Sequence, residues 1–176
     1  MIVLIPAYKP DNSLIRLTHQ LSAHSESIQV LVIDDGSGSE YAPIFTELTL
    51  TGATVITHPV NLGKGAAIRT GLNWARIYQP RQVVVTADAD GQHLVRDILR
   101  VGARTATHAD SGKHSLVLGV RTLPDNTAQG SGTVPARSKV GNALTIGFFA
   151  LATGTRLADT QTGLRGFTPQ MIEWAL

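Results

Sequence analysis

Short, unbroken apolar runs rich in β-branched side chains alternate with helix-like patterns along this chain of 176 residues. Such runs predict strands that are buried on both faces, because a strand with one solvated face shows an alternation of apolar and polar residues instead. Pro6 stops the first run, and turn-forming residues follow several of the others. The predicted strands are Ile2–Ile5, Ile28–Ile33, Ala53–Thr57, Gln82–Thr86 and Ser115–Val120.

Between these runs, apolar residues recur every three or four positions, which is the spacing of a helix with one buried face. Asp11 or Asn12 can cap the first of these helices, which carries Leu14, Leu17 and Leu21. Residues 122–138 are rich in Pro, Gly, Ser and Thr, so they predict a long loop that either acts on a ligand or is disordered. Further helices are predicted near Tyr41–Leu50, across Ala67–Ala75, and near Val95–Thr107, Ser138–Ala152 and Pro169–Leu176.

The alternation of strands and helices predicts an α/β fold, with a mostly parallel central sheet flanked by helices. The pattern shows no internal repeat and no boundary, so we expect one domain over residues 1–176. Ligands of such sheets bind beyond the carboxyl ends of the strands. Four polar signatures follow predicted strands, namely AYKP, DDGS, DADGQ and GVR. They are therefore expected to converge on one rim.

Composition narrows the function classes. The formal charge of +2 suits small anionic ligands but falls short of the basic face of a nucleic-acid-binding protein. Cysteine is absent, which excludes disulfides and thiolate metal sites and fits a reducing cytosol. The N-terminus lacks the features of a signal peptide, and the longest apolar stretch, Val140–Ala152, is well below the ~20 residues that cross a bilayer.

The motif DADGQ places Asp88 and Asp90 two positions apart at the end of a buried strand. Two neighbouring carboxylates repel each other, and a bound divalent cation relieves that repulsion. Mg²⁺ and Mn²⁺ prefer oxygen ligands, often one or two carboxylates with substrate phosphates, and Gln92 offers another oxygen. A solvated turn is the alternative, since Asp and Gly are common in turns. The buried strand before the motif favours the metal site.

Two further motifs leave both a binding and a structural interpretation open. In DDGS (34–37), a carboxylate can accept hydrogen bonds from a nucleobase or ribose, or it can belong to an ordinary turn. In NLGKG (61–65), backbone amides at a helix N-terminus and the charge of Lys64 can hold a phosphate, or the glycines can simply cap the helix. The motif matches neither a Walker loop nor a dinucleotide fingerprint.

The late motif DTQTGLRGF combines Asp159, a candidate base or acceptor-orienting group, with Arg165, a candidate phosphate partner. An Asp–Arg surface pair is the alternative. Upstream, PARSK places Arg137 and Lys139 beside a predicted amphipathic helix, which suits either an anionic headgroup or a solvated basic turn. His93 is expected to pack or donate a hydrogen bond rather than ligate a metal.

Taken in order, IPAYKP, VLVIDDGS, NLGKGAAIRTG, DADGQH, GVR, RSKVGN and LADTQTGLRGF resemble family 2 glycosyltransferases. The similarity is to the polyprenyl-phosphate branch, which includes the dolichyl-phosphate mannose synthase-like and undecaprenyl-phosphate glucosyltransferase-like enzymes. It covers essentially the whole chain. The resemblance implies a GT-A fold, in which a Rossmann-like half binds a nucleotide sugar.

The resemblance also assigns roles to single positions. The implied nucleotide-sugar-binding residues are Pro6, Ala7, Tyr8, Asp35, Lys64, Asp88 and Ala89. Asp90 and Gln92 would hold Mg²⁺ or Mn²⁺, and Arg121, Arg137 and Ser138 would line the acceptor side. The implied catalytic residues are Asp159, Asp90 and Arg165.

The implied reaction is inverting, metal-dependent transfer of a hexose from a UDP- or GDP-sugar, of the UDP-glucose or GDP-mannose class, to a polyprenyl phosphate at a membrane surface. The enzyme is then expected in the cytoplasm, peripheral on the inner face of the membrane, with its oligomeric state open. Relatives usually continue past GLRGF with further helices, whereas this sequence stops at Leu176, as a fragment or a short form would.

Two alternative functions remain open. DADGQ partly matches the DxDG[TV] motif of haloacid-dehalogenase-like phosphatases, although their motif follows the first strand and continues with Thr or Val, where this chain has Gln92. The other alternative is a shortened domain that binds nucleotide without turnover.

Overall fold

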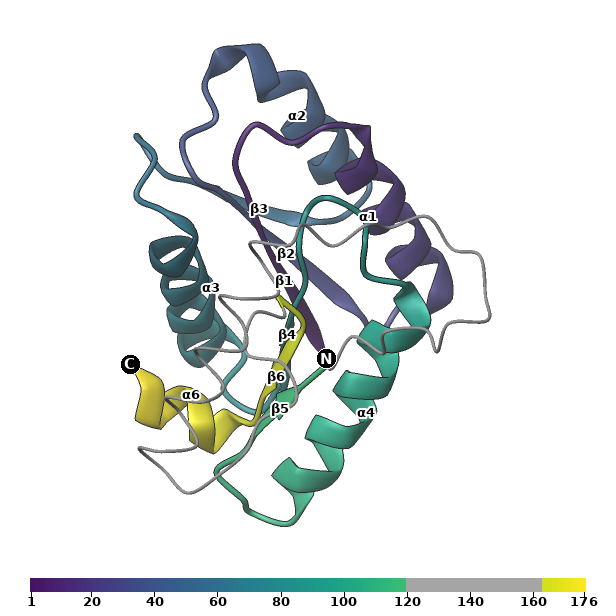
Figure 1. Cartoon of the computed structure of the whole chain (residues 1–176), viewed down its shortest axis with the longest axis vertical. Helices are drawn as coiled ribbons and strands as arrows, with labels where there is room; N and C mark the ends of the chain where they lie inside the picture. The colour runs from purple at the N-terminus through teal and green to yellow at the C-terminus, as the bar shows by residue number, and fades with distance from the viewer. Residues whose placement is uncertain (120–162) are drawn as a thin grey trace, which may run out of the picture. The chain divides into compact units, whose positions relative to one another are not determined.

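The computed structural model describes residues 1–119 and 163–176. Within these residues, strands and helices alternate from the N-terminus through β5, as the hydrophobic pattern predicts (Figure 1). The strands are β1 (Ile2–Ala7), β2 (Gln29–Asp34), β3 (Thr54–Thr57), β4 (Val84–Thr86), β5 (Leu116–Leu118) and β6 (Arg165–Phe167). The helices are α1 (Asn12–His24), the 3₁₀ turn η1 (Ser39–Tyr41), α2 (Ala42–Leu50), α3 (Lys64–Tyr78), α4 (Val95–Asp110) and α6 (Pro169–Ala175).

The strands form one sheet in the order β3-β2-β1-β4-β6-β5. The β3, β2, β1 and β4 strands are parallel, as predicted, whereas β6 runs antiparallel to both β4 and β5. The sheet is therefore mixed, and β6 was missed because it has only three residues, Arg165, Gly166 and Phe167, and no apolar run. The predicted α/β architecture with helices flanking a central sheet is confirmed.

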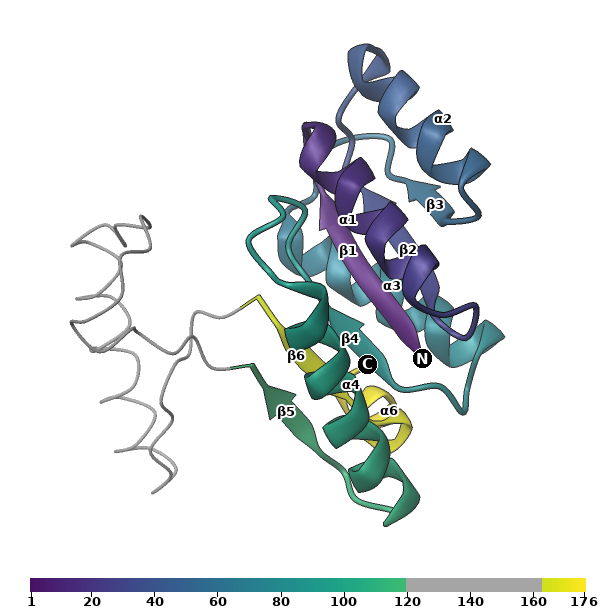
Figure 2. The same cartoon turned by 90° about the vertical axis from the view of Figure 1, so that its right-hand side faces the viewer.

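Two hydrophobic cores lie on opposite faces of the sheet. Alternate residues of β1 point to opposite faces, so Val3 and Ile5 join one core while Ile2 and Leu4 join the other. The first core receives side chains from α1, α2 and α4, and the second receives them from α3 and α6. Figures 1 and 2 show these helices covering the two faces. Burial on both sides explains why the parallel strands are continuously apolar.

Pro6 does not end β1, which continues to Ala7. The Ile2 N–H donates to the Val83 carbonyl of the β4 segment, and the Leu4 carbonyl accepts from Ala87 N–H. Because N–H groups alternate in direction along a strand, the position of Pro6 also faces β4. The β4 pairing has already ended there, at Leu4 with Thr86, so the missing proline N–H costs no ladder hydrogen bond.

The glycines of the GLRG segment explain how so short a strand enters the sheet. A Cβ at Gly166 would lie 2.0 Å from the Thr105 hydroxyl of α4, so only glycine lets β6 pack under this helix. Thr105 itself is fully buried and donates to the Val101 carbonyl. No helix in residues 1–119 or 163–176 is long and apolar enough to cross a membrane.

Gly36 holds the turn after β2 against the segment that leads from β3 to α3. Its φ is +72°, and a Cβ there would lie 2.3 Å from the Val60 carbonyl carbon, whereas Gly38 has φ +96° with open space around it. We expect Gly38→Ala to lower the free energy of unfolding by about 1 kcal/mol through strain alone. Gly36→Ala adds a backbone clash, and should cost about 3 kcal/mol or more. Urea unfolding of both variants checks this, and equal losses would contradict it.

Candidate nucleotide-sugar site

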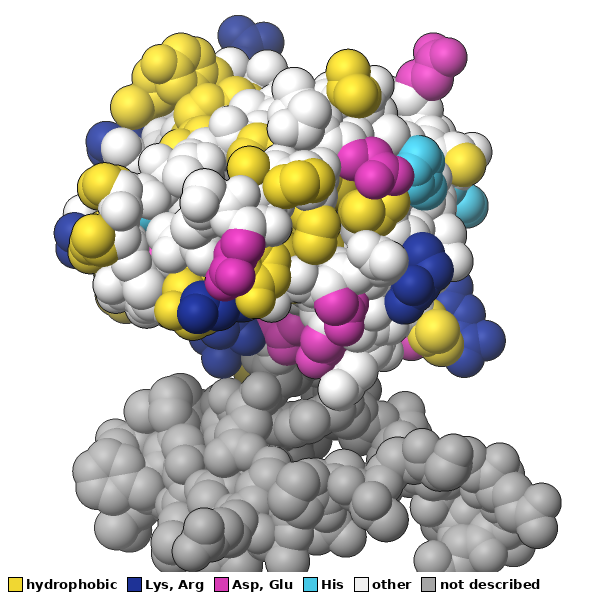
Figure 3. Space-filling model, turned by 90° about the horizontal axis from the view of Figure 1, so that it is seen from above, with side chains coloured by type: hydrophobic (Ala, Val, Ile, Leu, Met, Phe, Trp, Pro, Cys, Tyr) yellow, Lys and Arg dark blue, Asp and Glu magenta, His cyan; other side chains and the backbone are white. Residues whose placement is uncertain are grey.

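The carboxyl ends of β1, β2 and β4 meet around one cavity of about 530 Å³. Polar signatures that are far apart in the sequence come together there, as expected for ligand sites of parallel sheets. Figure 3 views the molecule from above and shows acidic and basic side chains close together among apolar ones on that face. The cavity is lined by Pro6, Ala7, Tyr8, Lys9, Pro10, Asp11, Asp35, Asn61, Gly63, Lys64, Asp88, Ala89 and Asp90.

Asp88 lies between Lys64 and His93 in this cavity. Its carboxylate accepts a 2.5 Å hydrogen bond from Lys64 Nζ, and His93 Nε2 lies 3.4 Å from its other oxygen. The His93 imidazole, followed by the Lys64 ammonium, lowers the pKa of Asp88 to about 2 in spite of partial burial, which acts to raise it. Asp88 is therefore ionised throughout the physiological range.

Asp88 also explains why a glycine, Gly163, stands in the late motif. A Cβ at Gly163 would lie 2.2 Å from an oxygen of the Asp88 carboxylate, so any larger residue at the entry to β6 would displace this carboxylate. The Gly163 carbonyl accepts a 2.7 Å hydrogen bond from the Thr86 hydroxyl at the end of β4. The DADGQ and GLRG motifs thus contact each other directly.

Asp90 is the more available carboxylate. Its Oδ1 accepts from the Gln92 backbone N–H at 3.0 Å, which forms the turn, and no other described residue bonds to it. Gly91 completes the turn with φ +71°. The described residues contain no cluster of three or more acidic or histidine side chains that could hold a metal. Two carboxylates facing one cavity nevertheless fit Mg²⁺ or Mn²⁺, which take one or two carboxylates with substrate phosphates.

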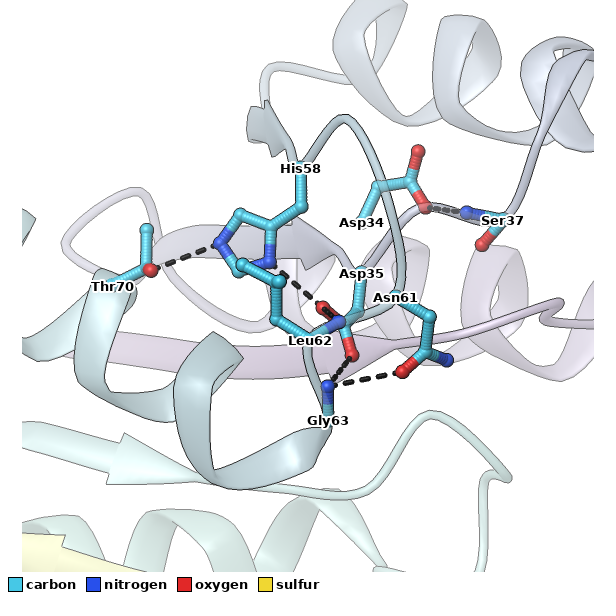
Figure 4. Close-up of polar contacts among 8 residues, drawn as sticks. All are labelled: Asp34, Asp35, Ser37, His58, Asn61, Leu62, Gly63 and Thr70. Carbon is cyan, nitrogen blue, oxygen red and sulfur yellow. Dashed lines mark hydrogen bonds and ion pairs between the residues drawn. The ribbon is translucent and has the colours of Figure 1, made fainter.

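Asp35 is buried, at 3% exposure, and belongs to a continuous hydrogen-bond network (Figure 4). Its Oδ1 accepts from His58 Nδ1 at 2.8 Å and Leu62 N–H at 3.0 Å, and its Oδ2 accepts from Gly63 N–H at 2.8 Å. Burial acts to raise the pKa of Asp35, but these donors lower it overall. The carboxylate therefore ties β2 to the segment before α3.

Asp34 and Ser37 connect the turn after β2 to the turn after β1, which lines the cavity. Asp34 Oδ1 accepts from Ser37 N–H at 2.9 Å, and Ser37 Oγ accepts from Lys9 N–H at 2.8 Å. Lys9 has φ 51°, the only positive φ at a non-glycine residue in the described part of the chain. This conformation is unfavourable for lysine, and the Ser37 bond helps to hold it. The turn leaves Tyr8 half exposed on the cavity, with Lys9 Nζ 5.5 Å from its ring centre.

The structure brings together eight of the residues singled out from sequence. Gln92 does not line the cavity, and Arg165 lies in β6, opposite Thr86 and Leu118, also off the cavity lining. Asp159, Arg121, Arg137 and Ser138 lie outside the described residues, as does the helix predicted near Ser138–Ala152. The eight that line the cavity are Pro6, Ala7, Tyr8, Asp35, Lys64, Asp88, Ala89 and Asp90.

Sequence reasoning missed other residues of this site. His58 carries no motif of its own, and its contact with Asp35 spans 23 positions. Lys9 and Asn61 sit inside motifs that were recognised, but nothing in the sequence shows that they face the cavity. His93 was expected to pack or donate a hydrogen bond, and the structure places it against Asp88. Asp11 caps α1 by accepting from Ser13 N–H, as predicted.

The mixed six-stranded sheet flanked by helices is the architecture of the GT-A class of α/β proteins, which the solved structures of similar fold share. The chain belongs to glycosyl transferase family 2, whose family model matches residues 2–127. This membership confirms the resemblance seen in the motifs and favours the transferase over the phosphatase alternative.

Curated relatives match almost the whole chain. The UDP-N-acetylglucosamine–dolichyl-phosphate N-acetylglucosaminyltransferase of Methanococcus voltae is 29% identical over 187 residues, covering 97% of this chain and 70% of the relative. The polyprenol monophosphomannose synthase of Mycolicibacterium smegmatis is 25% identical over 175 residues, covering 98% of this chain and 63% of the relative. The chain spans about half to two thirds of most such relatives.

Solved structures of similar fold include glucosyl-3-phosphoglycerate synthase from Mycobacterium tuberculosis in complex with Mn²⁺, uridine diphosphate and phosphoglyceric acid. The TM-score is 0.63 at 16% identity, and the match covers 96% of this chain and 55% of that structure. At this identity the likeness shows the shared fold.

The depressed pKa of Asp88 predicts a pH dependence of stability. Because its folded pKa of about 2 lies below the ordinary 3.8, the ionised group stabilises the fold above about pH 4, and this contribution is lost as the pH falls toward 2. In metal-free buffer, Asp88→Asn should lower the free energy of unfolding by about 1–2 kcal/mol at pH 7 and much less at pH 2. Urea unfolding against pH measures this. Asp110→Asn, at an exposed site on α4, is the control; a constant Asp88→Asn deficit down to pH 2 would contradict the assignment.

Proposed function

We propose that this chain is the donor-binding part of an inverting glycosyltransferase, which moves a hexose from a UDP- or GDP-sugar to a polyprenyl phosphate. The observation that carries the proposal is the convergence of Tyr8, Asp35, Lys64, Asp88 and Asp90 on one cavity at the carboxyl ends of the parallel strands. Membership of glycosyl transferase family 2 supports the reaction class. The names of the curated relatives support the acceptor class.

Different residues of the cavity would bind different parts of the nucleotide sugar. The half-exposed ring of Tyr8 offers an aromatic face to a nucleobase. Asp35 has about one acceptor position left beyond its three bonds to described donors, and that position suits a base N–H. Lys64, on the first turn of α3, brings positive charge toward a diphosphate.

The donor set fits a divalent cation. Asp90 would hold Mg²⁺ or Mn²⁺ through its available oxygen, with Asp88 beside it and Gln92 close in sequence. When bound, such an ion supplies Lewis-acid stabilisation of the charge that develops on a departing nucleoside diphosphate. Lys64 is a second positive group at the same place, because its ammonium reaches Asp88. Binding of the diphosphate would give this ammonium another anion to contact.

A polyprenyl phosphate acceptor needs little help from a base, since its phosphate oxygen is already ionised near neutral pH. Asp159 would then position the acceptor more than deprotonate it. Positive charge and hydrogen bonds to the acceptor phosphate would come from Arg121, Arg137, Ser138 and Arg165. A lipid acceptor implies work at a membrane surface, which supports a peripheral, cytoplasmic location. The sugar and the base stay open between the UDP-glucose and GDP-mannose classes.

Replacing Asp90 tests the proposal directly. With Mn²⁺, UDP-glucose or GDP-mannose and a short-chain polyprenyl phosphate, Asp90→Asn should lower kcat/KM roughly 100-fold or more, because a carboxylate ligand is lost where charge develops. Transfer of labelled hexose measures the rate, and Asp110→Asn on the distant, exposed end of α4 is the control.

Three outcomes decide between the alternatives. An unchanged rate for Asp90→Asn would refute the assignment of the carboxylate. Nucleotide binding by the unsubstituted protein without any transfer would favour a binding domain without turnover. No binding of any UDP- or GDP-sugar, with or without Mn²⁺, would count against both, and thermal shift reads this out.

A further inference from the structure

His58 is a buried histidine with both ring nitrogens engaged, and no step of the proposed reaction uses it. It follows β3 directly and is 7% exposed. Its Nδ1 lies 2.8 Å from Asp35 Oδ1, and its Nε2 lies 2.9 Å from Thr70 Oγ1 on α3 (Figure 4). An ionised carboxylate only accepts hydrogen bonds, so Nδ1 carries the proton. In the neutral ring, Thr70 then donates its hydroxyl to Nε2.

This arrangement fixes the orientation of the Asp35 carboxylate. His58 occupies Oδ1 from one side while Leu62 N–H reaches the same oxygen and Gly63 N–H reaches Oδ2. Thr70 holds the imidazole from its far side, so the ring cannot turn without breaking this bond and the buried bond to Asp35. Three of about four acceptor positions on Asp35 are thereby used, and the direction of the last is set by the network.

The same network reaches the other acidic motif. Gly63 immediately precedes Lys64, the first residue of α3, and Lys64 Nζ bonds Asp88. The path from His58 through Asp35 and Gly63 to Lys64 therefore connects the DDGS segment with the DADGQ segment through direct contacts. A shift of the Asp35 carboxylate would move the start of α3, and with it the stem of the lysine that faces the diphosphate region.

We propose that His58 is a positioning residue for the nucleotide donor: its Nδ1–H orients Asp35, and through Asp35 it sets the 61–64 segment in the binding-competent position. The inference rests on the proposed function and deepens it. His58 itself stays off the lining of the donor cavity, so it acts through Asp35 and not by touching the ligand.

Two substitutions separate the roles of the two ring nitrogens. The amide of His58→Asn places an N–H near the position of Nδ1, so it can keep the bond to Asp35 while losing Thr70. The longer His58→Gln places its amide near the position of Nε2, so it can keep Thr70 while losing Asp35. Both variants remove the same buried ring, so a loss of thermal stability common to both reports the missing ring, and the difference between them reports the two hydrogen bonds.

The experiment is calorimetric titration of the full chain with UDP and with GDP in the presence of Mn²⁺, together with amide hydrogen exchange. We expect His58→Asn to keep nucleotide affinity within about threefold, and His58→Gln to lose about tenfold or more, the worth of one hydrogen bond to a charged group. The Leu62 and Gly63 amides should exchange faster in His58→Gln than in His58→Asn. Equal affinity losses in the two variants, or no loss in either, would overturn the proposal.

Two further measurements keep the test decisive. If His58→Asn does not fold, Thr70→Val takes its place, because it removes only the far-side partner and leaves the Nδ1–H bond to Asp35. It should keep nucleotide affinity within about threefold and show slower exchange at Leu62 and Gly63 than His58→Gln. Losses equal to those of His58→Gln would overturn the inference. If the unsubstituted protein binds no nucleoside diphosphate, the proposed function fails. The exchange comparison then still decides whether His58 holds the 61–64 segment.

Discussion

The structure depends on holding several carboxylates close together at one rim of a sheet. Asp34 ends β2 and Asp35 follows it, and Asp88 and Asp90 follow β4. Four acidic groups therefore lie at the ends of strands that share the neighbour β1. A carboxylate that is drawn out of water needs hydrogen-bond donors of its own. Asp35 accepts from backbone amides and His58, Asp88 accepts from Lys64 with His93 beside it, and Asp34 and Asp90 accept from turn amides.

Supplying those donors dictates much of the local backbone. Segments that are distant in sequence must approach the carboxylates closely, and glycine stands where they do. Gly36 lies against the backbone of Val60 and Asn61, and Gly163 lies against the Asp88 carboxylate. The DDGS and DADGQ motifs both depend on NLGKG, since Asp35 accepts from the Leu62 and Gly63 amides and Asp88 accepts from Lys64. This explains why they occur together along one chain.

The same donors prepare the cavity for an anion. Lys64 is held on the cavity lining by its bond to Asp88, so in the proposed function little reorganisation is needed on binding. Family membership gives this arrangement its chemical context, because the proposed reaction creates negative charge on a departing diphosphate. In the proposed reaction, the described residues would serve the donor side.

The sequence by itself determined the parallel half of the fold and most of the residues that line the cavity at the sheet rim. Continuous apolar runs identify buried strands, and acidic turns at their ends point to the rim, because both signals are local. The tertiary structure decided the rest. The β6 strand exists because Gly166 and Gly163 permit close packing on Thr105 and Asp88, and His58 gains its role from a contact 23 positions away. Such pairings depend on which surfaces meet in space, and no local pattern of hydrophobicity or turn residues records that.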